Sequence, residues 1–338
     1  MRKLASIRKI SDIQSITGAD MIELAIVDGW KVVVAKNVGH KVGDLVVYCE
    51  IDSFLPIKEE FEFLRKSSYK KMSDGSEGFR LRTIKLRGQV SQGLILPLDV
   101  LLPTGVSSDD VYEGLDVTGT LNIKKYEPPI PAELAGKVKG LFPSFIRKTD
   151  EERIQNLTEE YEEMKNHTFY VTEKLDGSSA TFYYNNGEFG VCSRNLELLE
   201  TEGNTFWKVA RELDLENKMR EYGMNISFQG ELIGEGIQGN PYKIKGQTVR
   251  FFNLFDIDLQ EYHSLSVFKE TMKVLGLETV PVLDINFHLP ETIDKLLLMA
   301  DGKSELNPNF DREGVVIRSL DRKISFKVIS NKFLLNEK

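Results

Sequence analysis

The sequence predicts an α+β protein of two domains, a small all-β barrel followed by a larger domain in which strands and helices alternate. Three observations support this prediction: the chain has 338 residues, its first third is dense in short strand-like runs, and the remainder mixes such runs with helical patterns. A chain of this length can form two separate hydrophobic cores.

Residues 1–125 are predicted to form a barrel of about five strands of the OB type, although an SH3-like barrel would give a similar pattern. Turn signals such as Asp28-Gly29 and Gly43-Asp44 separate the runs. OB barrels frequently bind nucleic acids. The strand-like runs are Met21–Val27, Trp30–Ala35, Leu45–Cys49, Phe79–Leu86, Gly93–Pro97 and Val117–Ile123.

A linker is predicted at residues 126–147, because its prolines cannot continue a strand ladder and favour an extended connection. The second domain is expected at residues 148–338 and is expected to begin with a helix over 148–165, capped by Thr149 or Asp150. Further strands are predicted at 169–173, 180–184, 189–193, 227–233, 249–258, 314–318 and 324–328, and helices near 204–222, 264–275 and 290–301.

Composition excludes several classes of protein. The two cysteines, Cys49 and Cys192, lie far apart among apolar neighbours and are predicted to be buried free thiols, and the four histidines lack zinc-ligand spacing. A net charge of −8 argues against binding nucleic acid by global attraction, so such a partner needs local basic patches. Without an apolar run of membrane-spanning length, we expect a cytoplasmic, nucleoid or nuclear protein that is neither secreted nor inserted in a membrane.

An ordered series of short motifs is the most informative feature. VTEKLDGSSA, residues 171–180, places a lysine between acidic residues, but a lone Lys-x-Asp-Gly occurs by chance in roughly one chain in ten of this length. The order of the series means more than any member. After the lysine motif come Ser193-Arg194-Asn195, FQGE ending at Glu231, FFNLFD over 251–256, REGVVIR over 312–318 and Ser325-Phe-Lys327, and KTDEERIQN precedes it at 148–156.

This ordered set resembles the nucleotidyltransferase motifs of ATP-dependent ligases and capping enzymes. Within that superfamily it is most similar to RNA ligases of the Naegleria type, which seal nicks and carry an OB domain ahead of the catalytic domain. The resemblance implies that the second domain is a ligase adenylation domain of antiparallel sheets and helices. It also implies a monomer that joins RNA 3′-hydroxyl and 5′-phosphate ends, with nicked duplex as the expected partner.

The resemblance implies a three-step reaction in which Lys174 attacks the α-phosphate of ATP, AMP passes to an RNA 5′-phosphate, and a 3′-hydroxyl displaces AMP. An ordinary lysine is neutral only about once in 2,500 molecules at pH 7, which opposes attack by roughly 4–5 kcal/mol. Nearby carboxylates strengthen this opposition. We therefore expect Asp176, Glu231 and Glu313 to hold Mg²⁺ or Mn²⁺, directly or through water, whose charge reverses the effect. Glu231 has the alternative role of binding ribose hydroxyls.

Further nucleotide contacts follow from the motif match. Phe252 is expected to stack on adenine, whereas Phe251 and Phe255 are expected in the core. Glu173 is expected to accept from adenine N6, and Lys327 to contact the α-phosphate. Many relatives carry a second lysine close to this last position, but here the next lysine is Lys332.

Four residues are expected at the phosphates and the RNA end. Arg194 is a candidate to grip phosphate or ribose, and Asn195 adds a hydrogen bond. Arg153 and Lys148 are candidates for the departing pyrophosphate.

The first domain offers a candidate RNA-binding surface. Arg80 and Arg82, then Lys85 and Arg87, recur at every second residue, which places each pair on one face of a strand. A solvated barrel face would look the same, but a focused basic strand in an acidic chain favours RNA contact.

Two alternatives to an RNA ligase stay open. A capping guanylyltransferase or a DNA ligase would use the same motifs, but those enzymes usually place the OB domain after the catalytic one. A non-catalytic RNA-binding OB protein with a decayed transferase domain is the second alternative, and the intact set of Lys174, Glu231, Glu313 and Lys327 argues against it.

Overall fold

The computed structural model describes residues 3–72, 75–106, 110–126 and 136–336. The chain divides into two compact units: unit 1 comprises Met1–Pro129, Ile154–Tyr161 and Leu334–Lys338, and unit 2 comprises Ile130–Arg153 and Glu162–Phe333. The chain therefore returns to unit 1 at residue 154, inside the predicted second domain. Residues 127–135 of the predicted linker lie outside the described residues, and the domain limits at 125 and 148 stay predictions.

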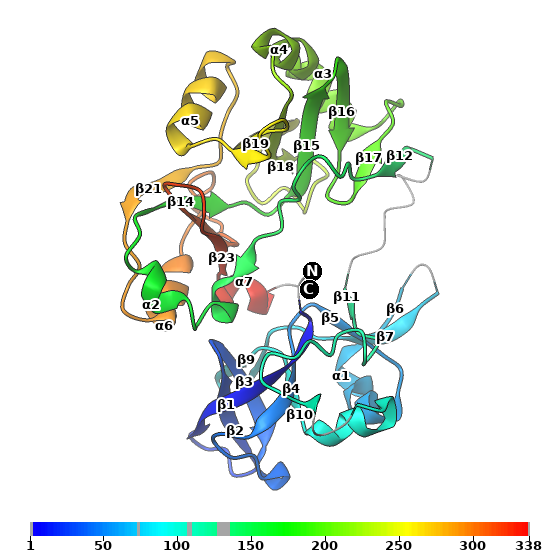
Figure 1. Cartoon of the computed structure of the whole chain (residues 1–338), viewed down its shortest axis with the longest axis vertical. Helices are drawn as coiled ribbons and strands as arrows, with labels where there is room; N and C mark the ends of the chain where they lie inside the picture. Colours follow the sequence, from blue (N-terminus) through cyan, green and yellow to red (C-terminus); the bar gives the residue numbers. More distant parts are fainter. Residues whose placement is uncertain (1–2, 73–74, 107–109, 127–135, 337–338) are drawn as a thin grey trace. The chain divides into compact units, whose positions relative to one another are not determined.

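Unit 1 contains a five-stranded antiparallel sheet in the order β10-β4-β1-β2-β3 (Figure 1). The residues just before the edge strand β10 make hydrogen bonds to the other edge strand, β3. The backbone N–H of Gln92 donates to the carbonyl of Lys31 at 2.7 Å, and the backbone N–H of Val33 donates to Ser91 Oγ at 3.0 Å. The sheet thus curls toward a closed barrel, as the sequence predicts. Its strands are β1 (Ala5–Ser15), β2 (Ile22–Val27), β3 (Trp30–Ala35), β4 (Leu45–Cys49) and β10 (Leu94–Leu96).

A long insertion separates β4 from β10. It forms most of a four-stranded sheet, ordered β11-β5-β7-β6, and a separate β8–β9 hairpin. The predicted strand over 79–86 is therefore wrong in its interior, and the stretch 117–123 forms turns instead of a strand. The elements are β5 (Ser53–Pro56), β6 (Tyr69–Lys71), β7 (Glu77–Arg80), β8 (Ile84–Leu86), β9 (Gln89–Ser91) and β11 (Lys124–Lys125), with η1 (Lys36–Val38), η2 (Glu59–Leu64), α1 (Arg65–Ser68) and η3 (Leu98–Thr104).

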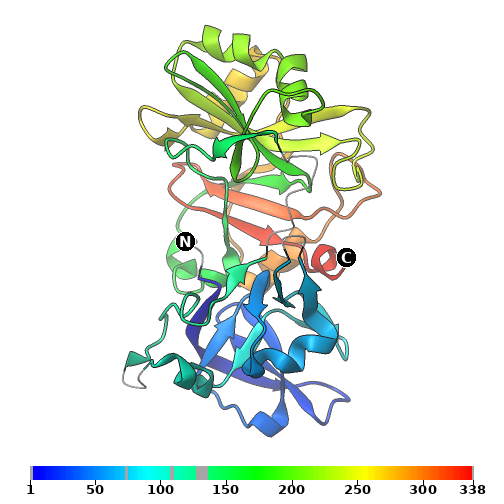
Figure 2. The same cartoon turned by 90° about the vertical axis from the view of Figure 1, so that its right-hand side faces the viewer.

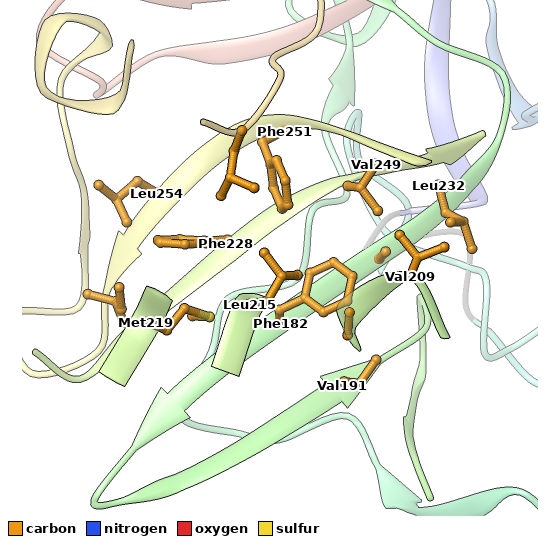
Figure 3. Close-up of a cluster of buried hydrophobic side chains, with 14 of the residues drawn as sticks. Phe182, Val191, Val209, Leu215, Met219, Phe228, Leu232, Val249, Phe251 and Leu254 are labelled. Carbon is orange, nitrogen blue, oxygen red and sulfur yellow. The ribbon is translucent and has the colours of Figure 1, made fainter. Parts of the chain in front are cut away.

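Unit 2 is built on a seven-stranded sheet and a five-stranded sheet. The larger one is antiparallel in the order β12-β17-β16-β15-β18-β19-β20. Helices α3, α4 and α5 cover one of its faces, where Phe182, Phe228 and Phe251 pack among their side chains (Figure 3). Its strands are β12 (Val138–Leu141), β15 (Ser178–Asn185), β16 (Glu188–Cys192), β17 (Leu196–Leu198), β18 (Ile226–Gly234), β19 (Gln247–Asp256) and β20 (Glu261–Tyr262).

The five-stranded sheet has the order β13-β23-β22-β14-β21, and Figure 2 shows its strands β22 and β23 side by side in orange and red. All neighbours are antiparallel except β13 and β23. The strands are β13 (Glu152–Arg153), β14 (Phe169–Lys174), β21 (Val282–Phe287), β22 (Gly314–Ser319) and β23 (Ser325–Ile329). The helices of the chain's second half are η6 (Ile154–Asn156), α2 (Tyr161–Met164), α3 (Thr205–Glu212), α4 (Leu215–Tyr222), α5 (Leu265–Val274), α6 (Ile293–Ala300) and α7 (Asn331–Asn336).

Two helix predictions need correction. The helix over 148–165 is wrong, because Glu152 and Arg153 pair in parallel with β23 and only α2 is α-helical in that stretch. The helix over 204–222 is split where Asp214 adopts a left-handed conformation at φ 52°. The prediction of buried free thiols is confirmed for both cysteines. Within the described chain, no helix has the length and apolarity needed to cross a bilayer.

Candidate functional site

The structure brings Lys174 against a carboxylate from a distant part of the chain. Lys174 ends β14 and pairs with Gly314 of β22, so Glu313 lies next to it. The amine Nζ is 2.7 Å from Glu313 Oε1, and both side chains are more than two-thirds buried. The lysine motif and the acidic residue of the REGVVIR motif therefore form one site.

Gly177 brings the second acidic residue to this site. A Cβ at position 177 would lie 2.4 Å from the carbonyl oxygen of Leu232 and 2.9 Å from Glu231 Cγ, so only glycine lets the lysine loop lie against β18. The backbone N–H of Asp176 donates to the hydroxyl of Tyr242 at 2.6 Å, which fixes the same loop. Glu231 thus faces the lysine from the seven-stranded sheet.

The electrostatics of the site match the conflict that the sequence predicts. Burial by itself lowers the pKa of Lys174, but the carboxylates of Glu313, Glu231 and Asp176 outweigh burial and raise this pKa. Burial raises the pKa of Glu231 to about 8, Lys174 opposes this rise, and Glu313 adds to it. The side chains by themselves therefore favour the ammonium form of the lysine.

The three acidic residues do not form a ready-made metal cage. In the part of the chain that the structure describes, no three His, Cys, Asp or Glu side chains converge as metal ligands. Instead, the ammonium group of Lys174 takes up one carboxylate oxygen of Glu313. The oxygen donors of these residues still suit a hydrated Mg²⁺ or Mn²⁺ ion, because Mg²⁺ usually keeps several waters in proteins.

Lys327 lies on the same face of the five-stranded sheet as Lys174. Thr172 pairs with Val316, and Val316 pairs with Lys327, so these side chains share a face with Lys174 two residues further along β14. Arg153 pairs with Lys327 from β13 on the other side. The register therefore places Lys174, Lys327 and Arg153 on one face of this sheet, and their phosphate contacts stay predictions.

Phe252 occupies a β-bulge. The register between β18 and β19 shifts between Gln229 and Gly230, which leaves Phe252 unmatched between Phe251 and Asn253. Phe251 and Leu254 remain in the core under the helices, whereas Phe252 packs with Leu175, Tyr242 and Val280 in a separate cluster. Bulges often redirect side chains beside active sites. Phe252 thus differs from its neighbours in the residues it packs against, and its stacking on adenine stays a prediction.

Glu173 points to the opposite face of β14 from Lys174, because successive strand residues alternate. Its side chain is buried, its Oε2 accepts from the backbone N–H of Glu305 at 2.9 Å, and its Oε1 has no hydrogen-bond partner among the described residues. Leu306, the next residue after Glu305, packs in the cluster that contains Phe252. A buried acceptor without a donor near that cluster suits an exocyclic amine such as adenine N6.

Arg194 and Asn195 meet residues 148–150. Asn195 Oδ1 accepts from Lys148 Nζ at 3.0 Å, and the guanidinium of Arg194 pairs with Asp150. Sequence reasoning considered Asp150 only as a helix cap. The pairing of Asp150 with Arg194 was missed because residues 148–165 were predicted to be a helix, in which Asp150 would only cap the first turn.

A second missed group surrounds Arg318. Its side chain is buried, it pairs with Glu151 at 3.2 Å and it donates to Thr172 Oγ1 at 3.2 Å. Its guanidinium lies 5.8 Å from the ring centroid of Phe252. Arg318 is the last residue of the REGVVIR motif, and its place in that motif was the sequence signal that could have marked it as a candidate.

Neither predicted basic pair of unit 1, Arg80 with Arg82 or Lys85 with Arg87, lies on one face of a strand. Arg80 is buried, and its guanidinium lies 4.2 Å from the ring centroid of Tyr126, so we correct its placement from a solvent-facing contact to a structural stack. Arg82 is half-buried outside any strand, Lys85 is exposed in β8, and Arg87 is exposed in the hairpin turn at φ 49°. Three of the four therefore remain accessible.

Comparisons with known proteins show which families and structures the chain is similar to. An OB-fold domain model matches residues 4–98, and the RNA ligase family model matches residues 167–330. A Naegleria gruberi RNA ligase mutant with AMP and Mn is 43% identical over 99% of both chains, with a TM-score of 0.92. The Naegleria gruberi RNA ligase with PPi is 44% identical over 99% of this chain and 98% of that chain, with a TM-score of 0.91.

A third structure, a Naegleria gruberi RNA ligase mutant with ATP and Mn, is 44% identical over 99% of both chains, with a TM-score of 0.91. The comparison with curated proteins gives no match.

Proposed function

The chain belongs to the RNA ligase family, and on this premise we propose that it joins RNA 3′-hydroxyl and 5′-phosphate ends with ATP, through AMP bonded covalently to Lys174. The single observation that supports the covalent role is the 2.7 Å contact between Lys174 Nζ and Glu313 in a pocket shared with Glu231. Removing charges from water is unfavourable, and even a buried ion pair adds little stability to a fold. An amine held among acids is therefore better explained by chemistry at the amine than by stability.

In the first step, the lone pair of Lys174 Nζ bonds to the α-phosphorus of ATP, the bond to the β-phosphate oxygen breaks, and pyrophosphate leaves. The amine must lose a proton, which the raised pKa of Lys174 opposes. A Mg²⁺ or Mn²⁺ ion held by Asp176, Glu231 and Glu313, directly or through water, supplies positive charge that offsets these carboxylates. The residues present fit both the metal ion and ATP. The acids supply oxygen ligands for the ion, and Phe252 supplies an aromatic ring for the purine.

The rest of the nucleotide is assigned to residues that the fold brings near the lysine. Phe252 stacks on adenine from its bulge, and the unpartnered Oε1 of Glu173 accepts from N6. Lys327 contacts the α-phosphate and stabilises charge there as the bond to pyrophosphate breaks. Arg153, beside Lys327 in the sheet, contacts the departing pyrophosphate together with Lys148.

In the second and third steps, the lysine–phosphorus bond breaks as an RNA 5′-phosphate oxygen attacks AMP, and a ribose 3′-hydroxyl then displaces AMP. Arg194 and Asn195 engage phosphate or ribose at the RNA end, which requires Arg194 to exchange its pairing with Asp150 for the ligand. Arg82, Lys85 and Arg87 of unit 1 contact the phosphate backbone of the RNA. The nicked duplex, the monomeric state and the cytoplasmic location stay predictions.

The proposal is tested by incubating the protein with α-labelled ATP or GTP and Mn²⁺, then denaturing it in detergent. We expect label on the protein with ATP and none with Lys174→Ala. Label with GTP alone would point to a capping enzyme, and no label would leave an RNA-binding protein. Sealing of matched RNA and DNA nicks then tests the preference for a ribose 3′-hydroxyl end.

A further inference from the structure

A chain of buried and half-buried polar groups joins the two sheets of unit 2. The guanidinium of Arg322 donates to Asn253 Oδ1 at 2.8 Å and to the hydroxyl of Tyr170. Asn253 in turn donates through Nδ2 to Gln229 Oε1 at 3.0 Å, and Gln229 Nε2 donates to the carbonyl of Arg147 at 2.7 Å. We call Tyr170, Arg322, Asn253 and Gln229 the inter-sheet relay.

The members of the relay come from both sheets. Tyr170 lies on β14 and Arg322 lies in the turn between β22 and β23, all in the five-stranded sheet, whereas Gln229 and Asn253 lie on β18 and β19 of the seven-stranded sheet. The side chains of Gln229, Asn253 and Tyr170 are at most 3% exposed. Arg322 itself is half-buried, so its hydrogen bond to Asn253 is a partly buried polar link from one sheet to the other.

On β18 and β19 the relay lies within two residues of the site residues. Tyr170 is on the same face of β14 as Lys174, and Gln229 is on the same face of β18 as Glu231. Gln229 is two residues from Glu231, a spacing of about 7 Å along a strand, and Asn253 directly follows Phe252. A displacement of the relay would therefore displace the site residues.

The acidic residues of the site are divided between the same two sheets. Glu231 belongs to β18, whereas Glu313 precedes β22 and contacts Lys174. Oxygens that share one cation must keep a fixed separation, so the affinity for the ion depends on how the two sheets are held. Hydrogen bonds, including those of a half-buried guanidinium, restrain direction and distance more sharply than apolar packing does.

We propose that Arg322 and Asn253 are positioning residues that hold Glu231 at a fixed distance from Lys174 and Glu313, and so set the affinity of the site for its divalent cation. This inference rests on the proposed function, which gives the divalent cation its role in adenylation. The relay does not touch the nucleotide in this proposal. It acts through the strands that carry the site residues.

Asn253→Ala tests the proposal, because it removes the acceptor for Arg322. We expect Mn²⁺ binding without nucleotide, measured by electron paramagnetic resonance, to weaken about 10-fold, the loss typical when a group that orients metal ligands is removed. The Mn²⁺ concentration for half-maximal adenylation should rise by the same factor, with a smaller change in the rate at saturating metal. Unchanged Mn²⁺ affinity in the folded variant would overturn the proposal.

Two further variants separate positioning from general stability. Leu254→Ala alters the next residue of β19, which is buried in the core under the helices, and should lower the melting temperature without changing Mn²⁺ affinity. Asn253→Asp keeps an acceptor for Arg322 and should restore most of the affinity lost in Asn253→Ala. If Leu254→Ala weakens Mn²⁺ binding equally, or Asn253→Asp restores nothing, the inference fails.

The readouts also distinguish this inference from the proposed function. If the wild-type protein takes no label from ATP, the proposed function fails. Mn²⁺ binding without nucleotide still tests the relay in that case.

Discussion

The lysine pocket of unit 2, formed by Lys174, Glu231 and Glu313, and the basic segment 78–93 of unit 1 place their charges in opposite environments. The pocket buries opposite charges against each other, with Lys174 28% and Glu313 16% exposed. The segment contains four basic and no acidic residues, and Lys85 and Arg87 are open to solvent. Chemistry at an amine requires charges that the fold must hold together, whereas contact with phosphate requires charges that water can still reach.

The difference shows in how much structure each region needs. The pocket depends on close packing at Gly177, on the pairing of β14 with β22 and on the inter-sheet relay. The β8–β9 hairpin is a small two-stranded sheet in which Ile84 is 44% and Leu86 38% exposed. Substitutions should therefore act strongly and locally in the pocket, and weakly and additively in the segment.

Loss of the amine gives the largest expected effect. Lys174→Ala should reduce covalent labelling by ATP by about 10³-fold or more, because no other group can take its place in the bond to phosphorus. Lys323→Ala, at a side chain that is 81% exposed, serves as the control and should label normally. Comparable labelling of both variants would show that the pocket is not where the covalent bond forms.

Glu313→Gln should follow, with about 10- to 100-fold slower adenylation. In metal-free protein it should also lower the pKa of Lys174, because Glu313 is the carboxylate that raises this pKa most. Wild-type protein has the raised pKa, so its stabilisation from the charged lysine is complete below the unfolded pKa and is lost as pH rises through the folded one.

The ¹³Cε chemical shift of Lys174, assigned by its absence in Lys174→Ala, measures this pKa directly. Glu291→Gln, at an exposed surface pair, is the control for Glu313→Gln. A pKa that stays unchanged or rises in Glu313→Gln would contradict the stated electrostatics.

Gly177→Ala should have a smaller effect. Its Cβ would meet the carbonyl oxygen of Leu232 at 2.4 Å, so the loop must move away from β18. We expect a loss of about 1–3 kcal/mol in the free energy of unfolding, measured with urea, and about 10-fold slower adenylation. Gly140→Ala is the control, since no atom lies within 4 Å of its Cβ. If the two variants unfold with the same free energy and adenylate at the same rate, close packing at Gly177 is not required.

The basic hairpin should give the smallest effect. Lys85→Ala combined with Arg87→Asn, which tolerates the left-handed backbone at position 87, should reduce the slope of log affinity for nicked RNA against log salt by about 2. Labelling by ATP should not change. The control pair is Lys41→Ala with Lys66→Ala, both exposed in unit 1. An unchanged slope would place the RNA elsewhere.

Sequence patterns were most successful where a residue's chemistry and its neighbours along the chain suffice. The strand at 227–233, the helix near 264–275 and the two buried free thiols were all predicted from local patterns. Patterns failed where a distant strand decided the outcome. The residues around 152 have helical composition, yet they pair with β23, and Arg80 has the spacing of a surface residue, yet it stacks under Tyr126.

By itself, the sequence singled out the amine, the acids and the aromatic residue that we propose to serve the nucleotide, because the order and type of these groups are properties of the chain. Only the tertiary structure decided that Glu313 is the carboxylate bonded to Lys174, that a bulge turns Phe252 out of the core, and that Arg322 links the two sheets. Each of these depends on pairing between strands far apart in the chain. Such pairing follows from the joint packing of whole sheets, which no local pattern specifies.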